Sequence, residues 1–248
     1  MGVMLGEQLA LDLRLHAQFS FESFFATPDS IVVPSLRRIA DNADEAEHQV
    51  FLHGVSASGK THLLHALCHA VHAAQRTSVY LPLAEFATTE HPASIVEGLH
   101  RLSVIALDDL HCVMGHARWE QALFSLINRT RDAGGRLVFA ARQPPEALHC
   151  HLPDLRSRLG WGPIFRLEPP DETLLRPLLQ HRAAQRGLRL SDSVLDYVLR
   201  YHNRDLVFLL DLLEQLDRAT LAAKRPLTVP FVRAHLRQND HALSRKPS

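Results

Sequence analysis

The sequence lacks several features that mark other classes of protein. It has three cysteines (Cys68, Cys112 and Cys150), and none forms a CxxC pair. This argues against a disulfide framework and fits a reducing compartment. Neither sign of charge predominates, since 27 lysines and arginines balance 27 aspartates and glutamates. Because chains built to coat nucleic acid are usually basic, we expect DNA contact to be indirect or weak.

Features of export and membrane insertion are also missing. The start of the sequence has no basic segment followed by an apolar one, as a signal peptide would have. No apolar run approaches the roughly 20 residues that span a bilayer. We therefore expect no membrane contact and a cytoplasmic protein.

The order of apolar and helical segments predicts an α/β domain followed by a helical bundle. Short apolar runs alternate with helical segments, which indicates a mostly parallel sheet. Strands are expected at residues 50–53, 78–83, 104–107, 136–141 and 164–167, and helices at 35–42, 61–74 and 119–132. After Pro169-Pro170, helical periodicity predicts four helices at 171–186, 191–201, 204–223 and 228–237. Asp171 and Ser191 are expected to cap two of them.

A phosphate-binding loop is predicted between the first strand and the helix that follows it. The pattern GxxxxGK[ST] is matched by Gly54, Val55, Ser56, Ala57, Ser58, Gly59, Lys60 and Thr61. Glycines let the backbone wrap a phosphate, and the loop amides and the helix N-terminus supply donors. We expect Lys60 to reach the β- and γ-phosphates and Thr61 to ligate Mg²⁺. The strand–loop–helix context disfavours a chance Gly/Ser-rich turn.

An apolar strand that ends in two acids supplies the expected partner of this loop. The run from Val104 to Leu107 delivers Asp108 at its carboxyl end, where it is expected to ligate Mg²⁺. Asp109 is expected to orient or deprotonate water. Many buried strands end in acids, so this assignment depends on the phosphate loop.

Histidines are frequent in the chain, and two groups of them have spacings found in metal sites. His62, His65, His69 and His72 share one face of a predicted helix. That helix should pack on the sheet, so a packed or solvated face is the better interpretation. The run His149–His151 is likewise interpreted as a loop.

Several segments resemble DnaA and Hda proteins, which are AAA+ P-loop proteins. The run from Leu152 to Gly162, LPDLRSRLGWG, resembles box VII, and the resemblance implies that Arg158 is the arginine finger. The run from Asn203 to Leu206 resembles sensor 2 and implies a nucleotide-contacting Arg204. The segments after the loop (HLLHA, starting at His62) and near the end of the lid (QLDRA and LTVPFV) also resemble this family. The resemblance covers about residues 8–237, and it adds His62 to the expected nucleotide contacts.

The resemblance is to Hda more than to DnaA. DnaA carries an N-terminal interaction domain and a C-terminal DNA reader, whereas this sequence has a short arm before the core and stops after the lid. The arm residues Gln8, Leu9, Leu11 and Leu13 resemble the motif that docks Hda on the DNA sliding clamp. The alternative is an ordinary amphipathic terminus. The expected parts are a flexible arm (1–18), an AAA+ α/β nucleotide-binding domain (19–168), a helical lid (169–238) and a disordered tail (239–248).

The resemblance implies a negative regulator of chromosomal replication that is bound to ADP, or ATP, with Mg²⁺. Docked on the clamp, such a protein presents its arginine in trans to ATP held by DnaA and stimulates hydrolysis, since an arginine finger is worth about 10³–10⁵ in rate. A homo-oligomer and association with the replisome are compatible with this role. For Arg158, a surface ion pair is the structural alternative. The functional alternatives are a helicase-loader-like ATPase similar to DnaC and a non-catalytic adaptor between clamp and DnaA.

One departure from the family pattern concerns hydrolysis by the chain itself. Where DnaA and Hda have Gly/Ser-Asp-Arg-Pro-Pro after the sensor 1 strand, this sequence has Ala141-Arg142-Gln143-Pro144-Pro145. The acid is replaced by Arg142. Whether this chain hydrolyses ATP unaided is therefore left open, as is its preference for ADP or ATP.

Overall fold

The computed structural model describes residues 19–24, 30–201 and 206–243. The chain divides into two compact units, residues 1–169 and 170–248, and each is described by itself. The proposed clamp-binding residues (Gln8, Leu9, Leu11, Leu13) and the sensor 2 residue Arg204 lie outside the described residues.

The first unit is built on a parallel sheet with the strand order β2-β3-β4-β1-β5. The strands are β1 (Gln49–His53), β2 (Ser78–Pro82), β3 (Val104–Asp108), β4 (Arg136–Ala141) and β5 (Ile164–Arg166). All four strand pairings are parallel, which confirms the predicted α/β class. In this order β4 lies between β1, which leads into the phosphate loop, and β3, which ends in the acids.

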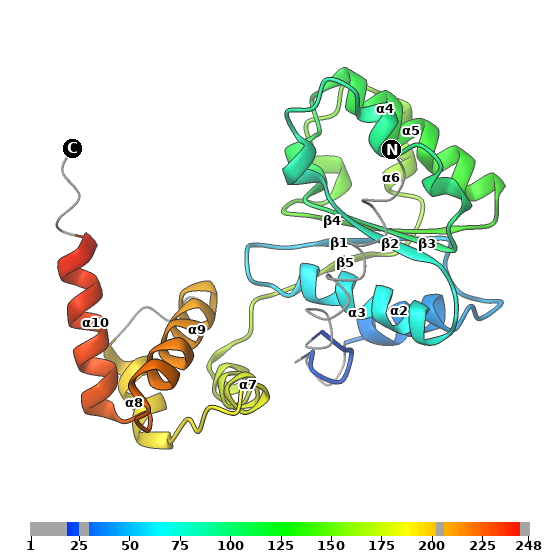
Figure 1. Cartoon of the computed structure of the whole chain (residues 1–248). Helices are drawn as coiled ribbons and strands as arrows, with labels where there is room; N and C mark the ends of the chain where they lie inside the picture. The colour runs from blue at the N-terminus through cyan, green and yellow to red at the C-terminus, as the bar shows by residue number, and fades with distance from the viewer. Residues whose placement is uncertain (1–18, 25–29, 202–205, 244–248) are drawn as a thin grey trace. The chain divides into compact units, whose positions relative to one another are not determined.

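Helices cover both faces of the sheet (Figure 1). One face carries α2 (Val32–Ala40) and α3 (Lys60–Ala73), and the other carries α4 (Pro92–Ile95), α5 (Ala117–Asp132) and α6 (Pro153–Leu159). Because neither face meets water, the central strands are apolar at nearly every position. The side chains of Val50, Leu52, Val104, Ala106, Val138 and Ala140 pack toward α2 and α3, and those of Phe51, Ile105, Leu107, Leu137 and Phe139 pack toward α5 and α6.

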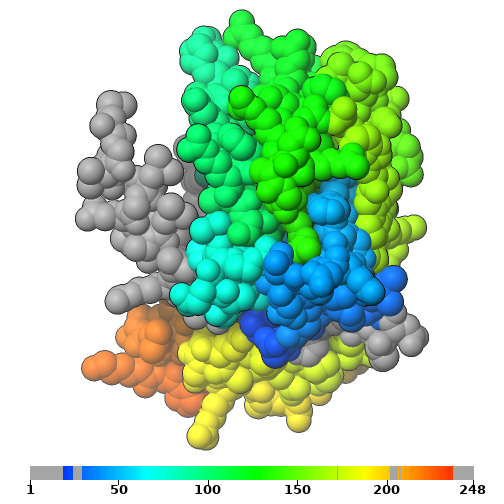
Figure 2. Space-filling model, turned by 90° about the vertical axis from the view of Figure 1, so that its right-hand side faces the viewer, coloured from blue at the N-terminus to red at the C-terminus, as the bar shows by residue number. Residues whose placement is uncertain are grey.

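Segments distant in sequence close the amino end of the sheet. Arg136, the first residue of β4, donates from Nη1 to Asn42 Oδ1 (2.8 Å) and from Nη2 to the Ala43 carbonyl (2.9 Å). Figure 2 shows the segment after α2, in blue, beside the green segment that contains α5 and β4. These bonds tie the entry of β1 to the entry of β4.

Short elements connect the strands, and the sequence pattern did not predict them. They are the 3₁₀ turns η2 (Leu83–Phe86), η3 (Leu99–Arg101), η4 (Leu110–Cys112) and η5 (Pro145–Ala147), together with α4 and α6. None is long enough to show helical periodicity. The proline at the first position of α4 and of α6 is a start signal that was available for both helices.

The second unit contains α7 (Glu172–Gln185), α8 (Asp192–Tyr201), α9 (Leu206–Ala223) and α10 (Val229–Leu243). The predicted cap at Asp171 is confirmed, since its Oδ1 accepts from the backbone N–H of Thr173 and of Leu174, each at 3.0 Å. Leucines of three helices line a small shared apolar interior: Leu179, Leu195, Leu209, Leu212 and Leu216. The last helix continues to Leu243, so helix occupies the first part of the expected disordered tail. No helix in the described part of the chain has the length and hydropathy needed to cross a bilayer.

Candidate functional site

The phosphate loop links β1 to α3 and holds its lysine inward. Lys60 is the first residue of α3, and only 7% of it is exposed. Its Nζ donates to the carbonyls of Gly54 and Val55, each at 2.8 Å, and to Ser58 Oγ at 3.2 Å. Burial, the largest influence, lowers the pKa of Lys60 although the nearby Asp108 and Asp109 raise it. The ammonium thus lies inside the loop, where a phosphate can replace carbonyl oxygens as its partner.

Two glycines allow the loop to close this tightly. Gly59 has φ 90°, and a Cβ there would lie 2.5 Å from the Phe24 ring. A Cβ on Gly54 would lie 2.2 Å from the Leu167 carbonyl oxygen, at the end of the neighbouring strand β5. Side chains at these positions would collide with their neighbours, so the loop requires glycine at both.

The acid at the end of β3 meets the loop directly. Asp108 is 1% exposed, and its Oδ2 accepts a hydrogen bond from Thr61 Oγ1 at 2.6 Å. Its Oδ1 accepts from the backbone N–H of Asp109 at 2.8 Å. A buried carboxylate beside a threonine hydroxyl is the donor set that Mg²⁺ prefers at a phosphate site, so these residues fit the metal that the fold class implies.

Tyr80 is a further contact of this acid that the sequence analysis missed. Its hydroxyl donates to Asp108 Oδ2 at 3.1 Å. Burial, together with the neighbouring carboxylates, raises the pKa of Tyr80 far above its ordinary value, so the hydroxyl stays protonated. Tyr80 pairs in register with Ala106, two residues before Asp108, which places its strand beside the acid. The proximity of Tyr80 to Asp108 follows from the order of the strands, and no local sequence pattern indicates it.

Arg142 lies at the same edge of the sheet. It follows β4 directly, after Ala141, whose carbonyl accepts from the Gly54 N–H at 3.3 Å. The side chain is exposed, and its charge contributes to lowering the pKa of Lys60, after the larger effect of burial. The structure thus brings Arg142, Lys60 and the acidic pair together.

The predicted histidine face of α3 is half buried and packs against aromatic rings. His62 and His65 are buried, whereas His69 and His72 are exposed. His62 Nε2 lies 2.9 Å from the Ser20 carbonyl, and the His65 ring lies 4.0 Å from the Tyr80 ring. No cluster of three or more possible metal ligands from His, Cys, Asp and Glu occurs among the described residues. A direct nucleotide contact by His62 stays a prediction.

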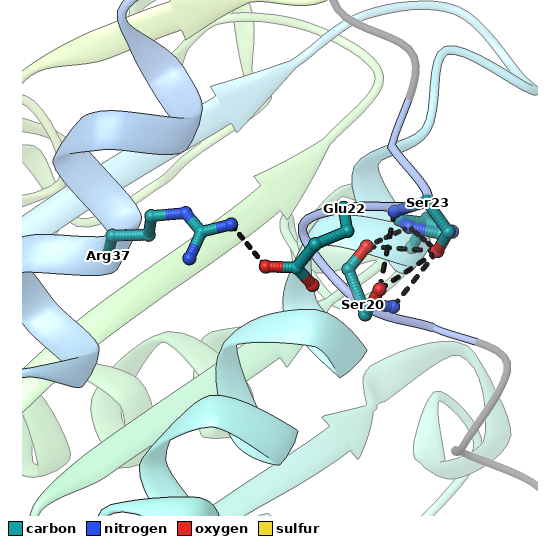
Figure 3. Close-up of polar contacts among 5 residues, drawn as sticks. Ser20, Glu22, Ser23 and Arg37 are labelled. Carbon is teal, nitrogen blue, oxygen red and sulfur yellow. Dashed lines mark hydrogen bonds and ion pairs between the residues drawn. The ribbon is translucent and has the colours of Figure 1, made fainter.

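The segment before α2 covers His62. Residues Ser20 and Ser23 bond to each other through backbone and hydroxyl groups (Figure 3). Glu22 pairs with Arg37 of α2 at 2.5 Å, and this hydrogen bond is the largest of the influences that lower the pKa of Glu22 to about 2. The segment is thereby fastened to α2 on one side and to α3 on the other.

Arg158, the predicted finger, lies near the end of α6. Its Cζ is 4.5 Å from the Phe124 ring centroid and 4.9 Å from that of Trp161. Within the described residues no carboxylate pairs with it, which argues against the surface ion pair considered above. Arg156, its neighbour, is held differently, because its Nη2 donates to the Cys150 carbonyl at 2.6 Å.

Box VII is anchored at the amino end of β1. Gln49 Nε2 donates to the carbonyls of Arg158 (2.7 Å) and Leu159 (3.1 Å). The phosphate loop starts at Gly54, beyond the other end of the strand. Five residues at about 3.3 Å each place Gly54 about 16 Å from Gln49. The backbone of Arg158 is therefore held at the edge of the sheet opposite the chain's own phosphate loop.

The loop before α6 is organised by a buried carboxylate that sequence analysis missed. Glu120 of α5 is 1% exposed and accepts from the backbone N–H groups of Gly115 (2.9 Å), His151 (3.0 Å) and Leu152 (2.8 Å). Burial by itself raises the pKa of Glu120, but these donors outweigh it and hold the pKa below its ordinary value. Glu120 therefore organises the loop that leads into box VII.

The parallel sheet, phosphate loop and helical second unit define an AAA+ P-loop protein with a lid. Residues 15–166 match the model of the bacterial DnaA ATPase domain, and residues 171–236 match the model of the Hda lid domain. An uncharacterized protein of Haemophilus influenzae is 35% identical over 230 residues, which cover 92% of this chain and 98% of that protein. The chain belongs to the Hda family of DnaA-related AAA+ proteins.

Solved structures agree with this fold. Domain III of DnaA from Thermotoga maritima superposes with a TM-score of 0.74 at 18% identity, covering 89% of this chain and 96% of that one. AMPPCP-bound DnaA from Aquifex aeolicus superposes with a TM-score of 0.64 at 19% identity, covering 78% and 63% of the two chains.

Proposed function

We propose that this protein binds an adenine nucleotide and regulates the replication initiator DnaA by presenting Arg158 to a nucleotide that DnaA holds. The Hda-like, DnaA-related fold supports a DnaA-regulatory role in general. The observation that carries the specific proposal is the separation of Arg158 from the phosphate loop of its own chain. A guanidinium held at the opposite edge of the sheet is suited to a partner's phosphate.

The nucleotide site supports the first half of the proposal. Lys60 and the loop amides would hold the β- and γ-phosphates, and the solved DnaA of Aquifex aeolicus carries the nucleotide analogue AMPPCP. Thr61 and Asp108 would hold Mg²⁺, which neutralises phosphate charge when bound. Asp109 would orient water. We keep ADP and ATP as alternative ligands of the resting protein.

The geometry of Arg158 supports the second half. Its guanidinium carbon lies over two aromatic rings, and the group pairs with no described carboxylate, so its N–H donors are available to phosphate oxygens. Docking on the sliding clamp through Gln8, Leu9, Leu11 and Leu13 would bring this surface to DnaA on DNA. The arm would bind as an extended peptide whose leucines fill an apolar groove.

The test is turnover of DnaA-bound ATP on clamp-loaded DNA. We expect parent protein to stimulate turnover and Arg158→Ala to lose most of the stimulation, up to the roughly 10³-fold or more that a finger supplies. Arg158→Lys should recover part, because lysine cannot bridge two oxygens in the same plane.

Arg156→Ala is the matched control, since it removes the same charge from the same helix. It should keep most of the stimulation. Full stimulation by Arg158→Ala would contradict the proposal, and loss in Arg156→Ala alone would move the finger to Arg156. Vigorous ATP turnover by the parent without DnaA would instead favour a motor or helicase loader.

A further inference from the structure

We propose that the cavity between box VII and the amino ends of β1 and β4 is a docking pocket for DnaA, in which Arg131 binds a carboxylate of the partner and the apolar wall takes a neighbouring side chain. The inference rests on the proposed function and deepens it, because it assigns recognition of the partner to a residue other than the proposed finger. Arg158 would act on the nucleotide, whereas Arg131 would bind the protein that holds it.

The cavity lies at the amino edge of the sheet, where Gln49 of β1 is in register with Leu137 of β4. Its volume is about 440 Å³, within the usual range of ligand pockets. Its walls come from the residue before β1, the end of α5, the start of β4 and the chain around the end of box VII: His48, Ile127, Leu137, Trp161, Gly162 and Pro163. Ile127 and Leu137 are buried, so the inner wall is apolar. The cavity therefore lies in the same edge that holds the backbone of Arg158.

Arg131 supplies the positive charge of the cavity. It lies in the last turn of α5, is exposed, and forms no hydrogen bond or ion pair with a described residue. Its Cζ lies 4.5 Å from the centroid of the Trp161 ring, a contact that leaves the N–H donors unused. Glu47, an acid of the same cavity, is already bound to Arg38 at 2.5 Å and to Ser35 Oγ at 3.2 Å. The planar guanidinium of Arg131 is thus available to a carboxylate from outside.

Gln49 connects the cavity to box VII. It is 7% exposed, and its Nε2 donates to the carbonyls of Arg158 and Leu159. Its Oε1 accepts no hydrogen bond from a described residue and is not among the buried unpaired atoms, so a ligand in the cavity can reach an acceptor as well as the donors of Arg131. A Cβ on Gly162 would lie 1.9 Å from the Gln49 carbonyl oxygen, so box VII and β1 are in backbone contact. An occupant of the cavity would therefore touch the residues that hold the proposed finger.

The surroundings of the cavity favour a protein over a nucleic acid as its occupant. The loop between α2 and β1 reaches the cavity at Glu47 and His48, and it also carries three exposed acids: Asp41, Asp44 and Glu45. These acids would repel a chain of phosphates, whereas one carboxylate bound to Arg131 need not approach them. Tryptophan and arginine beside an apolar pocket are also the residues that most often dominate binding energy between proteins.

The experiment is turnover of DnaA-bound ATP on clamp-loaded DNA, measured over a range of concentrations of this protein. The concentration that gives half-maximal stimulation reports docking, and the maximal turnover reports action on the nucleotide. Arg131→Ala should raise the half-maximal concentration by about 10-fold or more, as expected for the loss of a charge-assisted hydrogen bond, and should leave the maximum nearly unchanged. Arg131→Glu should raise that concentration further. Because Arg131 is exposed, both variants should melt at the parent's temperature.

Arg129→Ala is the matched control. Arg129 is exposed, carries the same charge in the same turn of α5, and lines a separate cavity between α5 and α4. The half-maximal concentration should not change in this variant, and a rise as large as that of Arg131→Ala would show a general charge effect and overturn the inference. His48→Trp is the second test, because it fills the cavity at an exposed position without removing Arg131. It should also raise the half-maximal concentration.

Other outcomes decide between this inference and the proposed function. A lower maximum at an unchanged half-maximal concentration in Arg131→Ala would overturn the inference, because Arg131 would then act on the finger through Trp161. Loss of binding to a single-stranded DNA oligonucleotide, with DnaA docking intact, would overturn it in favour of nucleic acid. Unaltered titrations for Arg131→Ala and His48→Trp would refute the inference and leave the proposed function standing. Arg131-dependent capture of ATP-bound DnaA in a pull-down, without any stimulation by the parent, would refute the proposed function alone.

Discussion

The guanidinium of Arg158 lies over the indole of Trp161, with Cζ 4.9 Å from the ring centroid, and Arg131 lies over the same ring at 4.5 Å. Trp161 is 50% exposed, so half of the residue lies outside the core. Stacking restricts the plane of a guanidinium without using its N–H donors. If Arg158 is the finger, as proposed, we expect Trp161 to position its guanidinium.

The first prediction tests whether Trp161 orients the guanidinium of Arg158. Trp161→Leu should lower the stimulation of DnaA-bound ATP turnover by about 2- to 30-fold, which corresponds to the roughly 0.5–2 kcal/mol of a cation–π contact. Trp161→Phe should restore most of it, because a ring is kept. The measurement is turnover at saturating protein, so that weakened docking does not enter. An equal loss of stimulation in Trp161→Leu and Trp161→Phe would contradict a role for the aromatic ring.

A second prediction concerns the hydroxyl that Tyr80 donates to Asp108. Tyr80→Phe keeps the ring beside His65 and removes one hydrogen bond, worth about 0.5–1.5 kcal/mol. We expect nucleotide affinity to fall by about 2- to 10-fold with Mg²⁺ present and to stay unchanged with Mg²⁺ chelated. Titrations with and without a chelator measure this. Tyr201→Phe, at an exposed tyrosine of the second unit, is the control.

A third prediction concerns stability and pH. Glu120→Gln replaces a carboxylate that accepts three backbone hydrogen bonds with an amide that has one acceptor oxygen and brings its own donors. We expect a loss of about 1–3 kcal/mol in the free energy of unfolding near neutral pH. Urea titration measures the loss.

The pH dependence of this loss follows from the lowered pKa of Glu120. Its contribution to stability is fully present above the ordinary pKa of an unfolded glutamate, about 4.3. It disappears as the pH falls through the lower pKa of the folded state. The difference in free energy of unfolding between the parent and Glu120→Gln should therefore become smaller as the pH falls. A difference that grows as the pH falls would contradict the stabilising role of the ionised Glu120 carboxylate.

A fourth prediction tests the arm. Gln8→Ala combined with Leu11→Ala should abolish clamp binding in a pull-down, because it removes a directional hydrogen-bonding group and an apolar side chain from the proposed docking motif. The melting temperature should not change. A parallel drop in melting temperature would mean that these residues support the fold, and unaltered capture by the clamp would refute the docking role.

Local sequence patterns predicted much of the fold. Apolar runs of four to six residues predicted five strands, and helical periodicity predicted the long helices to within a few residues. These patterns are reliable because each strand or helix must turn an apolar face to a core, whatever its partners are. Short elements such as α6 lack this periodicity, and the last turns of α10 lie in a polar segment that offered no apolar repeat.

The phosphate loop, the acidic strand, the box VII run and the succession of an α/β unit and a helical lid could all be predicted from sequence, because each is a contiguous pattern with its own physical rule. Which of these segments lie next to one another depends on the order of the strands in the sheet. The strand order places Tyr80 on Asp108 and Arg142 between the loop and the acids, and it anchors Arg158 at the opposite edge of the sheet. Strand pairing joins residues far apart in sequence, so local periodicity does not indicate which strands become neighbours.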